Sequence, residues 1–144
     1  MTTYQYNDGG REAAGFKGKA GDCVVRAIAI ASGRDYATVY NEVNQLSENE
    51  RGAKRSKANA GVYTSKKAFK DYMAAMGWRF VATMTIGSGC KVHLKAEELP
   101  AGRIICSVSK HYVAVIDGVI NDTFDPSRDG TRCVYGYWVQ GGAA

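Results

Sequence analysis

Residues 21–33 read GDCVVRAIAIASG, and this stretch decides the fold. Between Asp22 and Gly33 nearly every residue is apolar on all sides, which is typical of a helix in the middle of a core. Asp22 is the expected N-cap, and Gly33 is the expected left-handed residue after the last turn. Cys23 stands in the first turn, where the helix dipole favours a thiolate. Cysteine is also a common packing residue, so other parts of the chain must separate the two interpretations.

Two further helices are predicted after this one. Residues 35–46 place apolar side chains at helical spacing, which indicates an amphipathic helix that covers the first. Residues 47–61 are polar and charged with no apolar period, and we expect them to form a loop that is the most mobile internal segment. A third helix is expected over residues 63–77. The polar residues 1–20 are expected to form an irregular arm that includes a short strand at Thr3–Tyr6.

From residue 78 the apolar period changes to two, which predicts strands. These are expected over residues 78–84, 103–109 and 133–139, and in a hairpin over residues 111–124. The hairpin is the clearest of them, because apolar runs flank Asp117-Gly118, the dipeptide of a type I′ turn. Helices followed by an antiparallel sheet make an α+β fold. We expect one domain over residues 1–144, with a helical part over about 20–77 and a sheet part over about 78–140.

The hairpin also predicts a pair of functional side chains. With a two-residue turn, Ile116 pairs with Val119, and counting outward places His111 opposite Phe124. Side chains alternate between the two faces of a strand, so His111 and Asp122 project from the same face as diagonal neighbours. Diagonal partners lie about 7–8 Å apart at the backbone, within reach of an imidazole and a carboxylate.

These residues complete a possible site for covalent catalysis. A thiol nucleophile needs a base within hydrogen-bond reach, and the base needs a group that orients it. We therefore expect Cys23 as nucleophile, His111 as base and Asp122 as orienting residue. Asp125 is the alternative orienting residue, because loop geometry can override strand parity.

Three features together resemble a known family. They are GDC at residues 21–23 opening an apolar helix, HYVAVIDG at residues 111–118, and Asn121-Asp122. They resemble the papain-like cysteine peptidase superfamily, above all its short bacterial and bacteriophage-encoded members. In that family the cysteine begins the central helix, and the histidine and Asp or Asn follow from the sheet in this order. The resemblance implies a papain-like fold with N-terminal helices packed on a C-terminal antiparallel sheet, and the same three roles.

The chain departs from the family at one position. The family usually has a glutamine a few residues before the cysteine, which donates to the oxyanion, but residues 16–22 contain none. A lost oxyanion donor typically costs a factor of about 10²–10³ in rate. The replacement donors that we consider are the Cys23 backbone N–H and the side chains of Lys19, Lys17, Gln5 and Asn7.

The leading hypothesis is a cysteine hydrolase or acyl transferase, a peptidase or isopeptidase that forms a thioester on Cys23, acts on a peptide or protein and needs no cofactor. The alternative is a non-enzymatic binding module of the same fold. It would engage an acidic protein or nucleic acid through the basic segment of residues 51–70, which also suits a solvated surface. The basic side chains of this segment are Arg51, Lys54, Arg55, Lys57, Lys66, Lys67 and Lys70.

Composition restricts the remaining classes. The chain has 144 residues and a net charge of +5, and it contains no run of about 20 apolar residues, so we expect no membrane span. The N-terminus lacks the basic start and apolar centre of a signal peptide. We therefore expect a protein of the bacterial cytoplasm, or of a phage-infected host cell, with Cys23, Cys90, Cys106 and Cys133 as thiols.

Two features leave their role open. The segment CKVH at residues 90–93 has the spacing of half a zinc site, but a structural site needs four ligands and the second half is missing, so we expect no metal. Arg26 is unusual on so apolar a helix. Its side chain can reach solvent, pair with a carboxylate or line a cleft.

Overall fold

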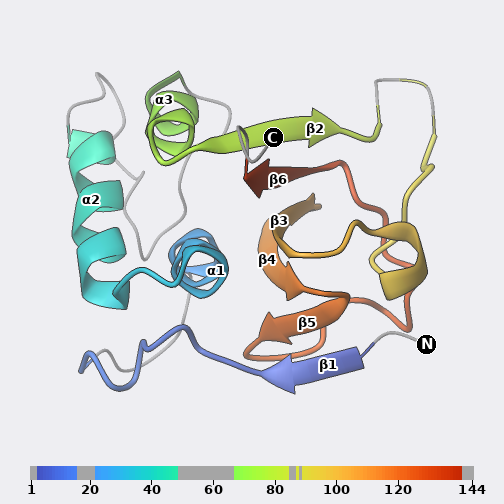
Figure 1. Ribbon diagram of the computed structural model, residues 1–144, viewed down its shortest axis with the longest axis horizontal. Helices are drawn as coiled ribbons and strands as arrows, with labels where there is room; N and C mark the ends of the chain where they lie inside the picture. The colour runs from blue at the N-terminus through green and yellow to red at the C-terminus, as the bar shows by residue number, and fades with distance from the viewer. Residues whose placement is uncertain (1–2, 16–21, 49–66, 85–86, 88, 141–144) are drawn as a thin grey trace.

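The computed structural model describes residues 3–15, 22–48, 67–84, 87 and 89–140 (Figure 1). In these residues the chain has the expected α+β class, with three α-helices and a six-stranded sheet. The helices are α1 Cys23–Ser32, α2 Tyr36–Glu48 and α3 Lys67–Ala75. Figure 1 shows α1 between α2 and the sheet.

The sheet is mixed, and its order is β1-β5-β4-β3-β6-β2. The strands are β1 Thr3–Tyr6, β2 Trp78–Ala82, β3 Arg103–Val108, β4 His111–Ile116, β5 Val119–Asp122 and β6 Gly136–Gln140, with a 3₁₀ turn η1 at Ala96–Glu98. The expectation of a purely antiparallel sheet is wrong at one edge, because β1 pairs with β5 in parallel. Parallel neighbours need a long crossover, and nearly the whole chain lies between these two strands.

Helix α1 is as buried as its composition predicts. Every residue from 24 to 31 is buried, and Gly33 has a φ of 74° with its N–H bonded to the Ala29 oxygen at 2.9 Å. The expected cap at Asp22 is wrong in one respect. Asp22 stands at the N-cap position, but its side chain makes no capping hydrogen bond and is used elsewhere.

The other helices differ from the prediction at their ends. Helix α2 runs two residues further than expected, so the first two residues of the predicted loop 47–61 are helical. The rest of that loop, and with it the prediction of high mobility, lies outside the described residues. So do residues 63–66 at the start of the predicted third helix.

The hairpin is confirmed. Asp117 and Gly118 have φ values of 49° and 80°, the two positive values that a type I′ turn requires. Ile116 pairs with Val119, as the two-residue turn predicts. This register places the start of β4 beside the end of β5, where the candidate base and carboxylate lie.

The sheet separates two apolar clusters. On one face Val25 and Ile28 of α1 pack in a cluster with Ile105 and Ala114. The other cluster contains Cys106, Val113, Val115, Ile120, Leu94 and Val134. Because α1 packs on the centre of the sheet, its first turn is held against β4.

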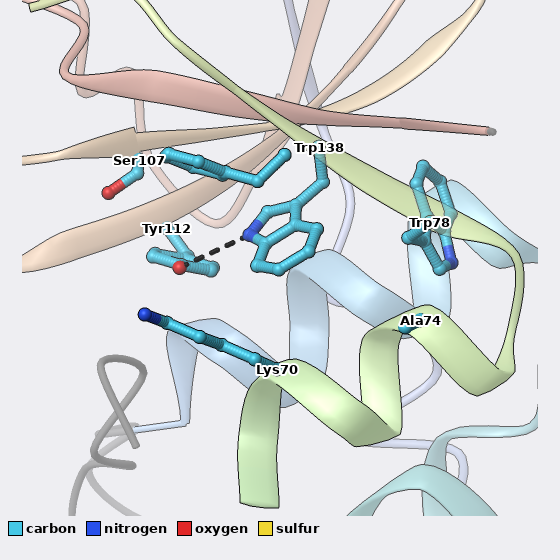
Figure 2. Close-up of a pocket in the computed structure, with 7 residues that line it drawn as sticks. Lys70, Ala74, Trp78, Ser107, Tyr112 and Trp138 are labelled. Atoms are coloured by element: carbon cyan, nitrogen blue, oxygen red, sulfur yellow. Dashed lines mark hydrogen bonds between the residues drawn. The ribbon is translucent and has the colours of Figure 1, made fainter. Parts of the chain in front are cut away.

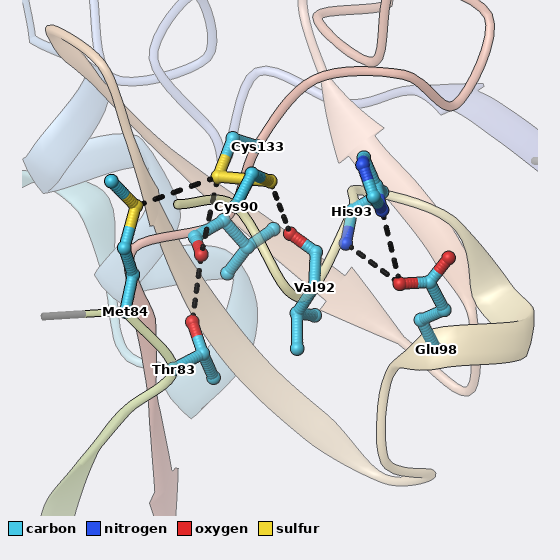
Figure 3. The surroundings of a disulfide bond; sticks show 8 residues. Thr83, Met84, Cys90, Val92, His93, Glu98 and Cys133 are labelled. Carbon is cyan, nitrogen blue, oxygen red and sulfur yellow. Dashed lines mark hydrogen bonds and ion pairs between the residues drawn. A yellow bond between two sulfur atoms is a disulfide. The ribbon is translucent and has the colours of Figure 1, made fainter. Parts of the chain in front are cut away.

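A disulfide joins Cys90 to Cys133, with the two Cα atoms 5.8 Å apart (Figure 3). The expectation that all four cysteines are thiols is therefore wrong for this pair, while Cys23 and Cys106 are free. An isolated bridge between His93 and Cys133 brings the two segments together, a long-range contact that sequence spacing does not show. The thiols were expected because of the cytoplasmic location, and a disulfide is more typical of an oxidising compartment. In the part of the chain that is described, no helix combines the length and apolarity needed to cross a bilayer.

Candidate active site

The structure brings Cys23 and His111 together. Cys23 is the first residue of α1 and is partly buried, and His111 is the first residue of β4. The His111 ring and the backbone N–H of Tyr112 lie close enough to the Cys23 sulfur to lower the pKa of its thiol. The start of the buried helix thus meets the start of the central strand at the thiol.

Asp122 completes the arrangement. Nε2 of His111 donates to the Asp122 carboxylate at 2.6 Å, which leaves Nδ1 as the nitrogen available to the sulfur. The other carboxylate oxygen accepts the Thr123 N–H at 2.7 Å. The Phe124 ring lies beside the imidazole, with ring centroids 5.2 Å apart. The side chains that strand parity placed on one face are therefore in direct contact.

The electrostatics of the pair favour a thiolate and an imidazolium. Burial alone raises the pKa of the Cys23 thiol, but the His111 hydrogen bond and charge, the Tyr112 N–H and the Arg26 charge together hold it below its ordinary 9.0. Burial alone lowers the pKa of His111, but its bonds to Asp122 and Cys23 raise it from 6.5 to about 9. Each shift favours the charged form of its group, the thiolate of Cys23 and the imidazolium of His111.

A buried ion pair network continues from Asp122 into the helix. Arg26 is 3% exposed, and one of its terminal nitrogens lies 3.4 Å from Oδ1 of Asp122. The other terminal nitrogen bonds Asp22, which also lies 3.2 Å from Nε of Arg11 and accepts the Tyr36 hydroxyl. Of the three roles left open for Arg26, pairing with a carboxylate is the observed one. Asp22 and Arg26 are four residues apart, a spacing that places two side chains on the same face of a helix. This spacing was the feature of the sequence that could have predicted their ion pair.

The alternative orienting residue is not in contact with the imidazole. Asp125 is exposed, and its carboxylate accepts the Ser127 N–H at 2.9 Å within its own loop. The oxyanion candidates Lys17 and Lys19 lie outside the described residues. Asn7 donates to Asn121 at 3.1 Å, and Gln5 is exposed on the edge strand β1. Among the candidate donors in the described segments, the Cys23 backbone N–H is the one at the thiol.

A cavity of about 520 Å³ opens between α3 and the sheet (Figure 2). Its walls are Lys70, Ala74, Trp78, Phe80, Ser107, Tyr112 and Trp138. Tyr112 connects the cavity to the site, because it directly follows His111 and its N–H is close enough to the Cys23 sulfur to lower the pKa of the thiol. Nε1 of Trp138 donates to the Tyr112 hydroxyl at 3.3 Å, which fixes the two aromatic walls relative to each other. The walls of this cavity come from five separate elements, so no local pattern in the sequence indicated it.

The predicted basic segment is described only in part, and its Lys70 lines the cavity. Of the basic segment, Lys67 and Lys70 alone are described; Lys67 pairs with Asp71 at 2.7 Å. Arg51, Lys54, Arg55, Lys57 and Lys66 lie outside the described residues. The possible zinc half-site is divided, because Cys90 is in the disulfide and His93 lies 3.2 Å from Glu98 (Figure 3). Within the described ranges, no three His, Cys, Asp or Glu side chains form a group that could hold a metal.

Comparisons of the chain with protein-family models, curated proteins and solved structures found no significant match.

Proposed function

We propose that this protein is a cysteine hydrolase or acyl transferase of the papain-like type. The observation that carries the proposal is the 2.6 Å hydrogen bond between His111 and Asp122, with Cys23 close enough to His111 for each to shift the pKa of the other. A nucleophile, a base and an orienting carboxylate in contact is the arrangement that acyl transfer through a thiol requires. The resemblance of the sequence around these residues to papain-like peptidases supports the same reaction.

The reaction begins with the thiolate–imidazolium pair. The Cys23 sulfur attacks the carbonyl carbon of a peptide, isopeptide or other amide, and the carbonyl oxygen takes the negative charge. The Cys23 N–H at the start of α1 is placed to stabilise that oxyanion. His111 then gives its proton to the leaving amine as the C–N bond breaks. The products of this step are a thioester on Cys23, a free amine and a neutral imidazole.

The second step regenerates the site. The neutral imidazole takes a proton from water, or from an acceptor amine, as the oxygen or nitrogen attacks the thioester carbon. The C–S bond breaks and returns the thiolate, with His111 again an imidazolium beside Asp122. Water gives hydrolysis, whereas an amine gives acyl transfer. Asp122 holds the His111 ring in the same orientation through both steps and does not itself react.

The proposed substrate class follows from the cavity that Tyr112 lines. The cavity beside Tyr112 has aromatic walls and about 520 Å³ of space, so it accommodates a bulky apolar side chain. Such a side chain on a peptide would anchor the chain next to the sulfur. We therefore propose a peptide or protein substrate with a large apolar residue close to the scissile bond.

The test is the reactivity of Cys23 without a known substrate. The full chain is treated with iodoacetamide over a range of pH, and the modified cysteine is identified by mass spectrometry. p-Nitrophenyl acetate serves as an acyl donor, and the acyl-enzyme is measured by intact mass. We expect rapid alkylation of Cys23 below pH 9 and acetylation that the Cys23→Ala variant lacks and the Cys106→Ala variant keeps.

The opposite result would favour the binding module. If Cys23 alkylates no faster than an ordinary thiol and takes no acetyl group, the catalytic proposal is wrong. The alternative function then predicts binding to nucleic acid that weakens steeply with added salt.

A further inference from the structure

Arg26 connects the helix of the nucleophile to the carboxylate of the site. It lies one turn after Cys23 on α1, and its two terminal nitrogens contact different carboxylates. One is Asp22, directly before the nucleophile, and the other is Asp122, at the end of β5. A single guanidinium therefore joins the start of α1 to the strand that carries the orienting residue.

The neighbours of this guanidinium are charged and buried. Asp22 and Asp122 are 1% and 3% exposed, so neither carboxylate can rely on water for its counter-charge. Arg11 forms an ion pair with Asp22, the Tyr36 hydroxyl donates to Asp22, and His111 bonds Asp122. Positive and negative groups alternate through three elements and the N-terminal arm, and they end at the thiol.

The two oxygens of Asp122 have different partners. Oδ2 accepts from His111, whereas Oδ1 lies near Arg26 at 3.4 Å and accepts the Thr123 N–H at 2.7 Å. A carboxylate held at both oxygens cannot rotate about its χ2 angle without losing one set of bonds. The contact at Oδ1 thus determines which way Oδ2 faces.

We propose that Arg26 is a positioning residue of the site, which acts through Asp122 to hold the His111 ring toward Cys23. The catalytic part of this proposal rests on the proposed function. The partners of Arg26 are two carboxylates, so its proposed role is to hold Asp122 and not to react itself. Its fork shape is essential, because two carboxylates on different elements must be bonded at once, and a lysine ammonium is a single point charge that does not provide that geometry.

The experiment compares Arg26→Lys, which keeps the charge, with Arg26→Met, which removes it. Arg34→Met is the matched control. The two terminal nitrogens of Arg34 donate to the Glu42 carboxylate at 2.6 and 3.0 Å, and this pair does not include a residue of the site. Each variant is made with and without Asp122→Asn. The readouts are the rate of acetylation by p-nitrophenyl acetate, its pH profile, and the titration of the His111 ring by NMR.

We expect Arg26→Lys and Arg26→Met each to lower the acetylation rate by up to about 10²-fold, the cost of a misplaced catalytic group. We also expect the His111 titration to move from about 9 toward 6.5, because a displaced Asp122 no longer bonds the ring. Arg26→Lys, which keeps the positive charge near the Cys23 thiol, should not add to the loss in the Asp122→Asn background. Arg34→Met should leave both readouts unchanged.

Two results would overturn the proposal. In one, Arg26→Lys matches the unmodified protein in rate and titration, so charge alone suffices. In the other, the effects of Arg26 and Asp122 add in full. If Arg26→Met does not fold, Arg26→Lys decides between these outcomes. The NMR titration needs no substrate, so it still tests positioning if the protein fails to form an acyl-enzyme and the proposed function is wrong.

Discussion

Cys23 and Cys106 are both free thiols, yet their surroundings are opposite. Cys106 lies within β3, has no exposed surface, and is surrounded by apolar side chains of the second cluster. Burial raises the pKa of its thiol to about 12. Cys23 stands at the start of α1, where an imidazole, a backbone N–H and a guanidinium lower the pKa of its thiol.

Burial does not separate the two cysteines, because it raises the pKa of both. The difference is the set of donors and positive charges around Cys23. A strand interior offers a side chain only its packed neighbours, whereas a helix start that meets a strand start gathers backbone donors and charged side chains. The position of a cysteine on its element therefore decides whether its thiol can react.

The largest expected effect comes from removing each thiol in turn. Cys23→Ala should reduce kcat by a factor on the order of 10⁶, the scale seen when the nucleophile of a hydrolase is removed. Cys106→Ala should leave kcat unchanged and lower the free energy of unfolding by about 1 kcal/mol, an ordinary core substitution. Steady-state kinetics and urea unfolding measure the two effects. An active Cys23→Ala variant would show that the wrong thiol has been assigned.

The next effect comes from the base. His111→Ala should raise the pKa of the Cys23 thiol toward 9.0 and make it more like Cys106. Loss of the acid and base should slow acyl transfer by about 10²–10⁴-fold. The rate of alkylation as a function of pH measures the first change and acyl-enzyme formation the second. His93→Ala is the matched control, since His93 pairs with Glu98 and should affect neither rate.

The orienting residue should have a smaller effect than the base. Asp122→Asn should slow acyl transfer by about 10²-fold, near the lower limit for acid–base catalysis. Acyl transfer needs the imidazolium as acid, so kcat/KM should fall as pH rises through about 9 in the unmodified protein. Without the Asp122 charge, the pKa of His111 decreases and this fall should begin at lower pH. Asp125→Asn should leave the pH profile unchanged, and the reverse pattern would assign the role to Asp125.

Removing the disulfide should have the smallest effect on the reactivity of the two free thiols. Replacing Cys90 and Cys133 together with serine should lower the free energy of unfolding by about 2–4 kcal/mol, because the unfolded chain loses a cross-link. The alkylation rates of Cys23 and Cys106 should not change in the folded protein, since neither thiol takes part in the bond. Chemical unfolding and mass spectrometry check the two statements, and a slower Cys23 would show that the disulfide supports the site.

Local patterns predicted the parts of the molecule that depend on near neighbours in the chain. The burial of α1 follows from its composition, and the contact between His111 and Asp122 follows from the Asp117-Gly118 turn and the alternation of strand side chains. Both features are determined within about a dozen residues, where the periods of helix and strand apply.

Long-range partners could not be predicted in this way. The parallel pairing of β1 with β5 and the bond from Cys90 to Cys133 each join two segments that are far apart in the sequence. Neither segment contains a pattern that identifies its partner. The side chain of Asp22 was expected to cap α1, but a nearby guanidinium is a stronger partner for a carboxylate than a backbone N–H. Competition among partners is settled only when the tertiary structure brings them together.

The most direct test is the titration of the Cys23 thiol itself. Its thiolate is followed by ultraviolet absorbance in the Cys106→Ala variant, with the disulfide intact, so that Cys23 is the one remaining thiol. The active-site assignment predicts that the thiolate forms below pH 9.0, and that adding His111→Ala shifts this titration upward. A thiol that titrates at or above pH 9.0, and that does not respond to the loss of His111, would contradict it.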